Sequence, residues 1–232
     1  MQNKKQETRN QSIFTISYKL VYSSFSPILV AWPYMGKESL VIGLIGKPGS
    51  GKTTLVNHVK DIASARLRIA ALRFSEVPRE LLKETGQEVT RENLQKFVQD
   101  MVKKEGADAL SRRIRTRISL VAANADVVVA DGVRWLVDAE MIRGFKKHAL
   151  VYIHAPGEVR HARIVLRKSE NVGDESKTLA QFLKEDSAEN ERHVDMLGRD
   201  ADFVIDNRGT QEELRARARA FFEEHCMSRM LL

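Results

Sequence analysis

One stretch of the chain combines glycines, a lysine and a hydroxyl at a spacing that suits phosphate groups: Gly46-Lys47-Pro48-Gly49-Ser50-Gly51-Lys52-Thr53. It matches the pattern G-x-x-x-x-G-K-[ST]. The glycines permit positive φ and let the backbone approach anionic oxygens closely, so that successive N–H groups converge on the phosphates. Lys52 would place its charge at the β- and γ-phosphates, and the Thr53 hydroxyl suits Mg²⁺. The predicted chemistry is therefore the binding of a nucleoside triphosphate.

An ordinary glycine turn is the alternative explanation of this stretch, and its context argues against that explanation. An apolar run, Leu40 to Ile45, precedes the motif, and a helical pattern, Thr54 to Ala65, follows it. A helix that begins directly after the loop would direct the positive end of its dipole at a bound anion. The residues expected to contact the nucleotide are Gly46, Gly49, Ser50, Gly51, Lys52, Thr53 and Thr54.

A carboxylate at the end of an apolar stretch is the second candidate for chemistry. Val127-Val128-Val129-Ala130 is followed by Asp131, as expected of the strand that brings an acidic group to a phosphate-binding loop. Asp131 would hold Mg²⁺ or accept a proton from the group that is phosphorylated. A helix N-cap for the next segment is the other interpretation, and the phosphate-binding motif upstream favours the functional one.

The elements that must position these residues alternate along the chain. Short apolar runs are separated by longer amphipathic ones, which is typical of a parallel sheet covered by helices. Strands are expected at 40–45, 67–74, 126–130, 150–154 and 203–205, and helices at 54–65, 78–83, 90–104, 107–124, 133–145, 159–166, 179–196 and 211–224. Pro78 would lie in a first helical turn and Thr90 would be an N-cap. The predicted fold is a three-layer α/β/α sandwich.

The composition indicates one globular domain over residues 35–232. Of 232 residues, 43% are hydrophobic and 30% are charged, which is the balance of ordinary globular proteins. The single cysteine, Cys226, cannot form an internal disulfide, and no Cys/His spacing resembles a zinc site. We therefore expect a cytoplasmic protein. The net charge of +7 suits nucleic acid, a membrane surface or anionic phosphates, and it does not distinguish among them.

Residues 1–34 differ in composition from the rest of the chain. They are polar and cationic up to Gln11, after which apolar and aromatic residues alternate with serines and Lys19. This segment is too interrupted for a membrane helix, which needs about 20 predominantly apolar residues, and it has no cleavage pattern of a signal peptide. We expect an N-terminal extension that is disordered or that precedes a native start at Met35. A weak membrane or partner anchor is the alternative.

In these motifs the chain resembles the nucleoside-monophosphate-kinase-like branch of P-loop proteins, and within it an archaeal-type family of adenylate-kinase-like and dephospho-CoA-kinase-like proteins. The resemblance covers about Leu40 to Phe222. It implies the P-loop NTPase fold, with a five-stranded parallel sheet and a mobile lid. It also implies ATP and Mg²⁺ as cofactors and a small-molecule nucleotide as acceptor, and it makes nucleic acid an unexpected partner.

The resemblance assigns acceptor-binding roles to two segments. Asp131-Gly132-Val133-Arg134 is similar to an Asp-Gly-…-Arg element of the family. The arginine of that element is expected to contact phosphates, so Arg134 would serve both catalysis and acceptor binding. The stretch from Phe74 to Glu80 lies where the acceptor-binding helices of the family begin. This implies that Glu76 and Arg79 bind the acceptor, with Arg79 matching the family's acceptor arginine.

The C-terminal part of the resemblance concerns the adenine and the lid. The segment 201–210 resembles a loop that lies beside the adenine in dephospho-CoA kinases, which implies a nucleotide contact by Asn207. The lid would be the polar loop 167–177, and Arg167 would be catalytic because a guanidinium fork can grip a transferring phosphoryl group. Arg160 and Arg163, on the preceding helix, would belong either to the lid or to a solvated basic face.

Two departures from the family pattern bear on turnover. Ser75-Glu76 stands where the family usually has Gly-Asp, and Glu185-Asp186 stands where it usually has Arg-Asp. Loss of a lid arginine would weaken phosphoryl transfer strongly. The sequence therefore supports nucleotide binding more firmly than kinase turnover.

Three functions follow from these features. The first is an ATP-dependent phosphotransferase acting on a small nucleotide-like acceptor, in the manner of a nucleoside monophosphate kinase. The alternatives are a dephospho-CoA kinase-like enzyme and a nucleotide-dependent switch or nucleic-acid-linked ATPase without kinase activity. The last is motivated by the substituted lid and by four arginines on one predicted helix, namely Arg112, Arg113, Arg115 and Arg117. A basic wall beside an anionic acceptor would explain the same arginines.

Overall fold

A computed structural model describes residues 38–63, 67–166, 177–187 and 189–231. Its strands are β1 (Leu40–Ile45), β2 (Ile69–Arg73), β3 (Val127–Val133), β4 (His148–His154) and β5 (Phe203–Asp206). They form one parallel sheet in the order β2-β3-β1-β4-β5. The predicted five-stranded parallel sheet is confirmed. The expected N-terminal extension and Arg167 lie outside the described residues.

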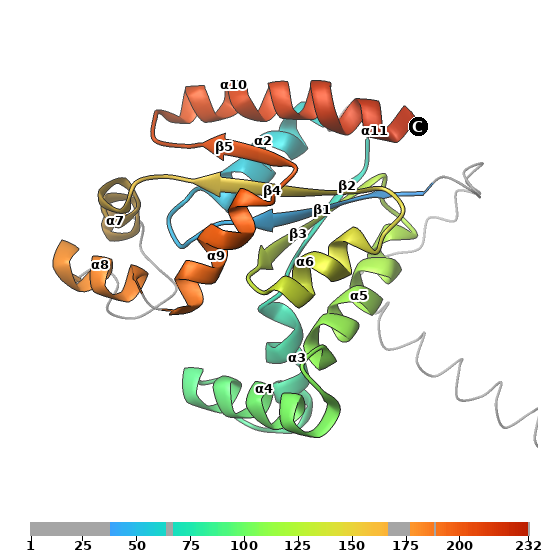
Figure 1. Cartoon of the computed structure of the whole chain (residues 1–232). Helices are drawn as coiled ribbons and strands as arrows, with labels where there is room; N and C mark the ends of the chain where they lie inside the picture. Colours follow the sequence, from blue (N-terminus) through green and yellow to red (C-terminus); the bar gives the residue numbers. More distant parts are fainter. Residues whose placement is uncertain (1–37, 64–66, 167–176, 188, 232) are drawn as a thin grey trace, which may run out of the picture. The chain divides into compact units, whose positions relative to one another are not determined.

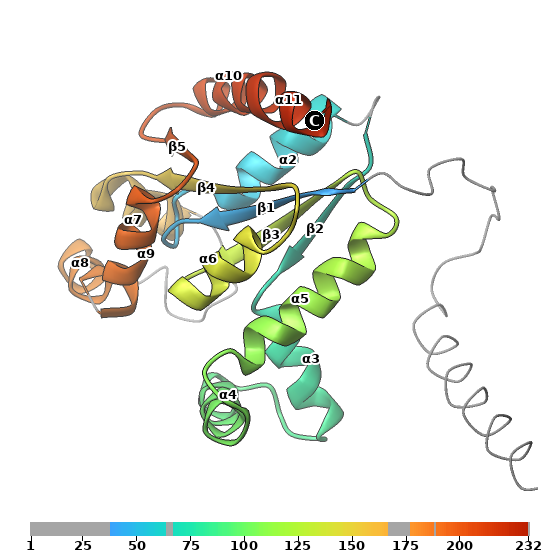
Figure 2. The same cartoon turned by 45° about the vertical axis from the view of Figure 1, so that its right-hand side comes forward.

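Helices cover both faces of the sheet (Figure 1). One face carries α2 (Lys52–Ala63), α10 (Gln211–Phe221) and α11 (Met227–Leu231), and the other carries α5 (Ala109–Ala122), α6 (Leu136–Arg143) and α9 (Glu189–Arg199). The remaining helices are α3 (Glu76–Glu84), α4 (Arg91–Glu105), α7 (Gly157–Leu166) and α8 (Leu179–Asp186). Figure 2 shows α3 and α4 beside the first turns of α5, beyond the end of the sheet.

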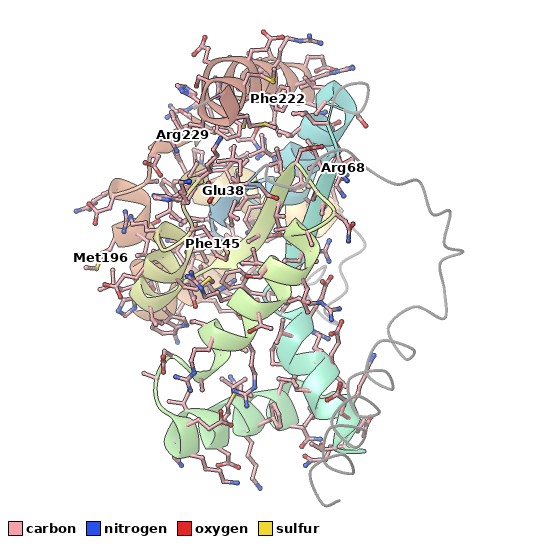
Figure 3. The ribbon with its side chains drawn as sticks, turned by 90° about the vertical axis from the view of Figure 1, so that its right-hand side faces the viewer. Glu38, Arg68, Phe145, Met196, Phe222 and Arg229 are labelled. Atoms are coloured by element: carbon pink, nitrogen blue, oxygen red, sulfur yellow. The ribbon has the colours of Figure 1, made fainter. Side chains whose placement is uncertain are left out.

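The central strands β1 and β3 are buried on both faces, because successive residues point into opposite layers and helices cover both layers. In β1, Leu40 and Ile42 pack in the core beneath α2 and α10, whereas Val41 and Ile45 pack in the core beneath α5 and α6. Figure 3 shows Phe222 in the layer of α10, with Phe145 in the opposite layer. Double burial of β1 and β3, and the pairing of β2 with β3, hold the carboxyl ends of these three strands side by side.

The structure confirms the expected N-cap of α4, a helix that contributes to a cavity described below. The Thr90 side chain accepts a hydrogen bond from the Asn93 N–H at 3.1 Å. Gly106 ends the helix with a φ of +99°, a conformation that favours glycine. Pro78 lies in the first turn of α3, as expected.

Several element ends differ from the prediction. The expected helix 179–196 is two helices: α8 ends at Asp186, next to Ser187, whose hydroxyl donates to the Lys184 carbonyl at 2.7 Å, and α9 begins at Glu189. The expected strand 126–130 continues to Val133, past a register shift opposite Leu44/Ile45. The closing helix continues beyond Phe221 through a π-helical turn into α11.

None of the helices in the described part of the chain is long and apolar enough to cross a lipid bilayer.

Candidate active site

The phosphate-binding motif forms the turn between β1 and α2. Gly49 and Gly51 have φ values of +76° and +101°, which favour glycine. Gly46 does not use this freedom, because its φ is not positive. Glycine is required there for a different reason, since a Cβ on Gly46 would lie 2.6 Å from the Ile153 carbonyl oxygen. The close approach of β4 therefore requires glycine at position 46, and the positive φ values of the turn favour glycine at positions 49 and 51.

The loop is supported from below by Asn207, which is only 4% exposed. Its Nδ2 donates to the Ser50 carbonyl oxygen at 2.8 Å, and its backbone N–H donates to the His154 carbonyl oxygen at 2.7 Å. A Cβ on Gly51 would overlap with the Asn207 Nδ2. The structure thus places Asn207 against the backbone of the loop, where it positions the amides that would face a phosphate.

Lys52 turns back over the loop at the start of α2. Its Nζ donates to the Gly46 carbonyl oxygen at 2.6 Å and to the Lys47 carbonyl oxygen at 3.3 Å. Thr53 is exposed and Thr54 is partly buried in the same helical turn. The Ser50 Oγ is buried and has no hydrogen-bond partner among the described residues. The loop therefore holds a cation, an exposed hydroxyl and a buried hydroxyl within one turn.

Asp131 lies in β3 between the loop strand and β2. It is in register with Leu44 of β1 and with Arg73 of β2. Its Oδ1 is buried and has no hydrogen-bond partner in the described part of the chain. Burial raises the pKa of Asp131, and the charges of Lys52, Arg73 and Arg134 oppose that effect. The N-cap of α6 is Trp135, so capping does not explain this carboxylate.

The arrangement fits a magnesium ion that is shared with a bound nucleotide. A buried carboxylate oxygen without a partner is a site that a hydrated cation can satisfy. Across the described residues, no group of three or more His, Cys, Asp or Glu side chains could hold a metal ion alone. Mg²⁺ commonly binds through one or two protein ligands plus substrate phosphates. Thr53 and Asp131 are the groups at this site that suit such a role.

A cavity of about 630 Å³ opens beside Asp131, within the size range of small-molecule sites. Its charged lining residues are Lys52, Arg73, Asp131, Arg134 and Asp138, and its apolar lining includes Phe74, Val98, Val102, Leu110 and Trp135. The structure thereby brings together Lys52, Asp131 and Arg134, three residues singled out in the sequence. α4 and α5 supply the apolar wall.

Glu76 and Arg79, both expected at the acceptor, do not line this cavity. Both side chains are exposed at the start of α3. The Glu76 carboxylate accepts a hydrogen bond from the Arg73 backbone N–H at 3.3 Å, and its charge contributes to the raised pKa of Asp131. Glu76 therefore lies near the site but outside its wall.

Two lining residues carry no signal in the sequence. Arg73 lies within the predicted strand 67–74, and Asp138 lies in a predicted helix. Asp138 is 6% exposed; it accepts hydrogen bonds from the Ser111 Oγ at 2.7 Å and from the backbone N–H groups of Arg134 and Trp135 at 3.3 and 3.2 Å. Burial raises the pKa of Asp138 despite these bonds. Asp138 thus fixes the turn that carries Arg134.

A cluster of ion pairs joins the phosphate-binding loop to α7, α8 and α9. Arg160, which is buried rather than solvated, donates to both carboxylate oxygens of Asp186 at 2.7 and 2.6 Å. Lys47 of the loop lies 3.3 Å from the same carboxylate and 2.7 Å from that of Asp195. We call these four side chains the loop clamp. Asp186, the second residue of the Glu185-Asp186 pair that replaces the family's usual Arg-Asp, contacts both cations of the loop clamp.

The charges of the clamp govern the pKa of Asp186. Burial alone would raise this pKa, but the hydrogen bonds and charges of Arg160 and Lys47 outweigh burial and lower it. Arg163, the other arginine of α7, donates to the Gly209 carbonyl oxygen at 3.1 Å, and burial lowers its pKa. Neither arginine of α7 forms a solvated basic face.

Each of the four arginines singled out on α5 has a partner within the protein. Arg112 pairs with Asp108, Arg113 with Glu105, and Arg117 with Glu80. Arg115 donates to the carbonyl oxygens of Met141 and Gly144 at 3.2 and 3.1 Å. These contacts explain the arginines of α5 without a nucleic acid.

Comparisons with known proteins show the family and the fold of this chain. The sequence profile of a family described as "AAA domain" matches residues 42–193. A UPF0200/UPF0201 protein of Archaeoglobus fulgidus is 30% identical over 181 residues, which are 76% of this chain and 53% of that protein. A UPF0200 protein of Thermococcus kodakarensis is 24% identical over 188 residues, which are 80% of this chain and 97% of that protein. The chain thus spans about half the length of the A. fulgidus relative.

Solved structures share the fold at low sequence identity. A shikimate kinase from Bacteroides thetaiotaomicron superposes with a TM-score of 0.51 and 16% identity, over 79% of this chain and 98% of that one. This likeness concerns the arrangement of sheet and helices.

Proposed function

Because this chain belongs to the AAA domain family, we propose that it is an ATP-dependent phosphotransferase acting on a small nucleotide-like acceptor. One observation carries the proposal: Lys52 of the phosphate-binding loop and the buried carboxylate Asp131 line the same cavity. A donor phosphate at the loop and an acceptor in the cavity would then meet beside Asp131. The fold, the loop and a cavity of acceptor size all support this reading.

The residues of the loop would hold the donor. The amides of Gly46, Gly49, Ser50 and Gly51, with the first turn of α2, would face the phosphates, because a helix N-terminus favours anions. Lys52 would exchange its bonds to the loop carbonyls for bonds to phosphate oxygens. Asn207 would keep the amides in place from the other side. Thr54 would complete the first helical turn beside the phosphates.

Thr53 and Asp131 would hold Mg²⁺, which supplies neutralisation of the triphosphate charge when it is bound. Asp131 would alternatively take a proton from the attacking oxygen of the acceptor, and burial, which raises the pKa of this carboxyl, makes it a stronger base. Arg134 would stabilise the charge that spreads over the transferring phosphoryl group. Glu76, from the start of α3, and Arg167, of the expected lid, are proposed on the resemblance alone, and Arg79 is the acceptor arginine that the resemblance implies.

Product formation tests this function. The protein is incubated with ATP, Mg²⁺ and a panel of nucleoside monophosphates plus dephospho-CoA, and phosphorylated products are separated by anion-exchange chromatography. We expect one class of acceptor to be phosphorylated. A phosphorylated monophosphate supports the first function, whereas phosphorylated dephospho-CoA supports the alternative enzyme. ATP hydrolysis without any phosphorylated acceptor would instead support the nucleotide-dependent switch or ATPase.

A further inference from the structure

Arg73 occupies a position in the cavity that no motif marks. It is the last residue of β2 and is in register with Asp131 of the neighbouring strand. Its side chain lines the cavity together with Lys52, Asp131 and Arg134. Its charge is also close enough to Asp131 to lower the pKa of that carboxyl. A guanidinium group is thus placed at the carboxyl end of the sheet, next to the candidate catalytic carboxylate.

Arg79, which the resemblance favours as the acceptor arginine, lies elsewhere. The buried side of α3 is formed by Val77, Pro78 and Leu82. Arg79 is exposed and is not part of the cavity wall, whereas Pro78 is. The first turn of α3 therefore presents its apolar side to the cavity and its arginine to the solvent.

The charges around Asp131 favour an anionic ligand, because the cavity is lined by three cations, Lys52, Arg73 and Arg134, and by two carboxylates, Asp131 and Asp138. The carboxylate of Asp138 accepts hydrogen bonds from Ser111 and from two backbone N–H groups. The guanidinium of Arg134 donates to Glu191 at 2.9 Å, so its charge is shared with α9. Lys52 donates to the loop carbonyls. Arg73 is the cation of this lining that lies in register with Asp131 on the neighbouring strand.

The rest of the wall is suited to a flat apolar group. Val98 and Val102 of α4 face the cavity together with Leu110 of α5. Trp135 also lines the cavity and is 44% exposed, so part of its ring is available for stacking. A ligand with a phosphate at one end and a nucleobase at the other would match both parts of this cavity.

We propose that Arg73, and not Arg79, binds the phosphate of the acceptor, while the wall formed by α4, α5 and Trp135 holds its base. The planar fork of a guanidinium can donate two hydrogen bonds to one phosphate. This inference rests on the proposed function and specifies the acceptor site of that function. Arg73 is thereby an acceptor-binding residue of this chain.

The test compares matched ligands and matched variants. Calorimetry measures the affinity of wild type, Arg73→Gln and Arg79→Gln for the four common nucleoside monophosphates and for the corresponding nucleosides. Loss of a charge-assisted hydrogen bond should weaken the tightest monophosphate on the order of 10- to 100-fold in Arg73→Gln. The matching nucleoside has no phosphate, so its affinity for Arg73→Gln should differ from wild type by less than about twofold. Arg79→Gln should change the affinity for both ligands by less than about twofold as well. Arg73→Lys retains the charge without the fork and should lie between wild type and Arg73→Gln.

Three results would overturn the inference. They are equal losses of monophosphate affinity in Arg73→Gln and Arg79→Gln, a loss confined to Arg79→Gln, and no binding of any monophosphate to the wild type. Circular dichroism verifies that each variant is folded.

Turnover separates this inference from the proposed function. If wild type phosphorylates a monophosphate and Arg73→Gln leaves its KM unchanged, the inference fails and the kinase activity stands. If monophosphate binding depends on Arg73 but no product forms, the kinase activity fails and the inference stands.

Discussion

At the residue scale, Lys52 and Asp131 put opposite charges on the wall of one cavity, and each charge leads to a separate prediction. Lys52→Ala removes the only side-chain cation within the Gly46–Thr53 loop that faces this cavity. We expect the affinity for ATP with Mg²⁺ to fall roughly 100-fold, because a charge-assisted contact to the phosphates is lost. Titration calorimetry measures this change. Lys60→Ala, in the last turn of the same helix, is the matched control and should bind ATP like wild type.

Asp131→Asn separates the effect of the buried carboxylate on stability from its effect on phosphoryl transfer. Burial raises the pKa of Asp131, so the native state binds more protons than the unfolded state between the ordinary aspartate pKa of 3.8 and the raised value. Wild-type stability therefore falls through this window as the pH rises. We expect Asp131→Asn to be at least as stable as wild type at pH 7, while phosphoryl transfer falls at least about 100-fold.

Urea unfolding of both proteins from pH 4 to pH 8 checks the sign of this effect. The free energy of unfolding of wild type should decline relative to that of Asp131→Asn as the pH rises. A relative increase would contradict the assignment of a raised pKa to Asp131.

At the scale of elements, the loop clamp connects the phosphate-binding loop to the end of α8 through Asp186. The Arg160 side chain is 5% exposed and that of Asp186 is 14% exposed, so Asp186→Asn would leave a buried cation without its counter-charge. We expect a loss of about 3 kcal/mol in the free energy of unfolding at pH 7. Glu185→Gln removes the neighbouring carboxylate, whose side chain is 60% exposed, and should cost less than about 1 kcal/mol.

The pH dependence of the clamp has the opposite sign to that of Asp131. The pKa of Asp186 is lowered, so its contribution to stability is present above the ordinary aspartate pKa. It is lost as the pH falls through the lowered pKa of the folded protein. Urea unfolding at pH 7 and below pH 4 measures both effects. Equal destabilisation by Asp186→Asn and Glu185→Gln at pH 7 would contradict a structural role for the clamp.

The sheet and the loop are predictable from the sequence because both depend on neighbouring residues. An apolar run, a glycine-rich turn and an amphipathic helix follow one another from Leu40 to Ala63, and each limits the conformation of the next. The break between α8 and α9 is not predictable in this way. It lies at Ser187, whose hydroxyl donates to the Lys184 carbonyl, and helical periodicity carries no information on such a side-chain-to-backbone bond.

The candidate site is only half predictable from the sequence, because only some of its residues belong to local motifs. Lys52 and Asp131 belong to local motifs, whereas Arg73 and Asp138 reach the cavity through the order of strands and helices. The partners of the clamp are also distant in sequence, since Lys47 and Asp186 are 139 positions apart. No spacing rule connects such residues, so their association emerges only from the fold.

For the molecule as a whole, nucleotide binding should appear as added thermal stability. A ligand present at 100 times its Kd stabilises the native state by about 2.7 kcal/mol. For a domain of this size that corresponds to a rise in Tm of roughly 5 to 11 °C. Differential scanning fluorimetry with ATP and Mg²⁺ measures the shift. An equal shift in Lys52→Ala would place the stabilising nucleotide at another site.

The hydrogen bond between Asn207 and Ser50 spans 157 positions of the chain, and this separation bears on the biosynthesis of the protein. Translation completes the glycine-rich motif early, but β5 and Asn207 leave the ribosome after all the other strands. Long-range contacts of this kind form late, because a large loop must close first. We therefore expect a nascent chain to contain the full motif before its loop is ordered for phosphate binding. It should gain affinity for nucleotide only when β5 has joined the sheet.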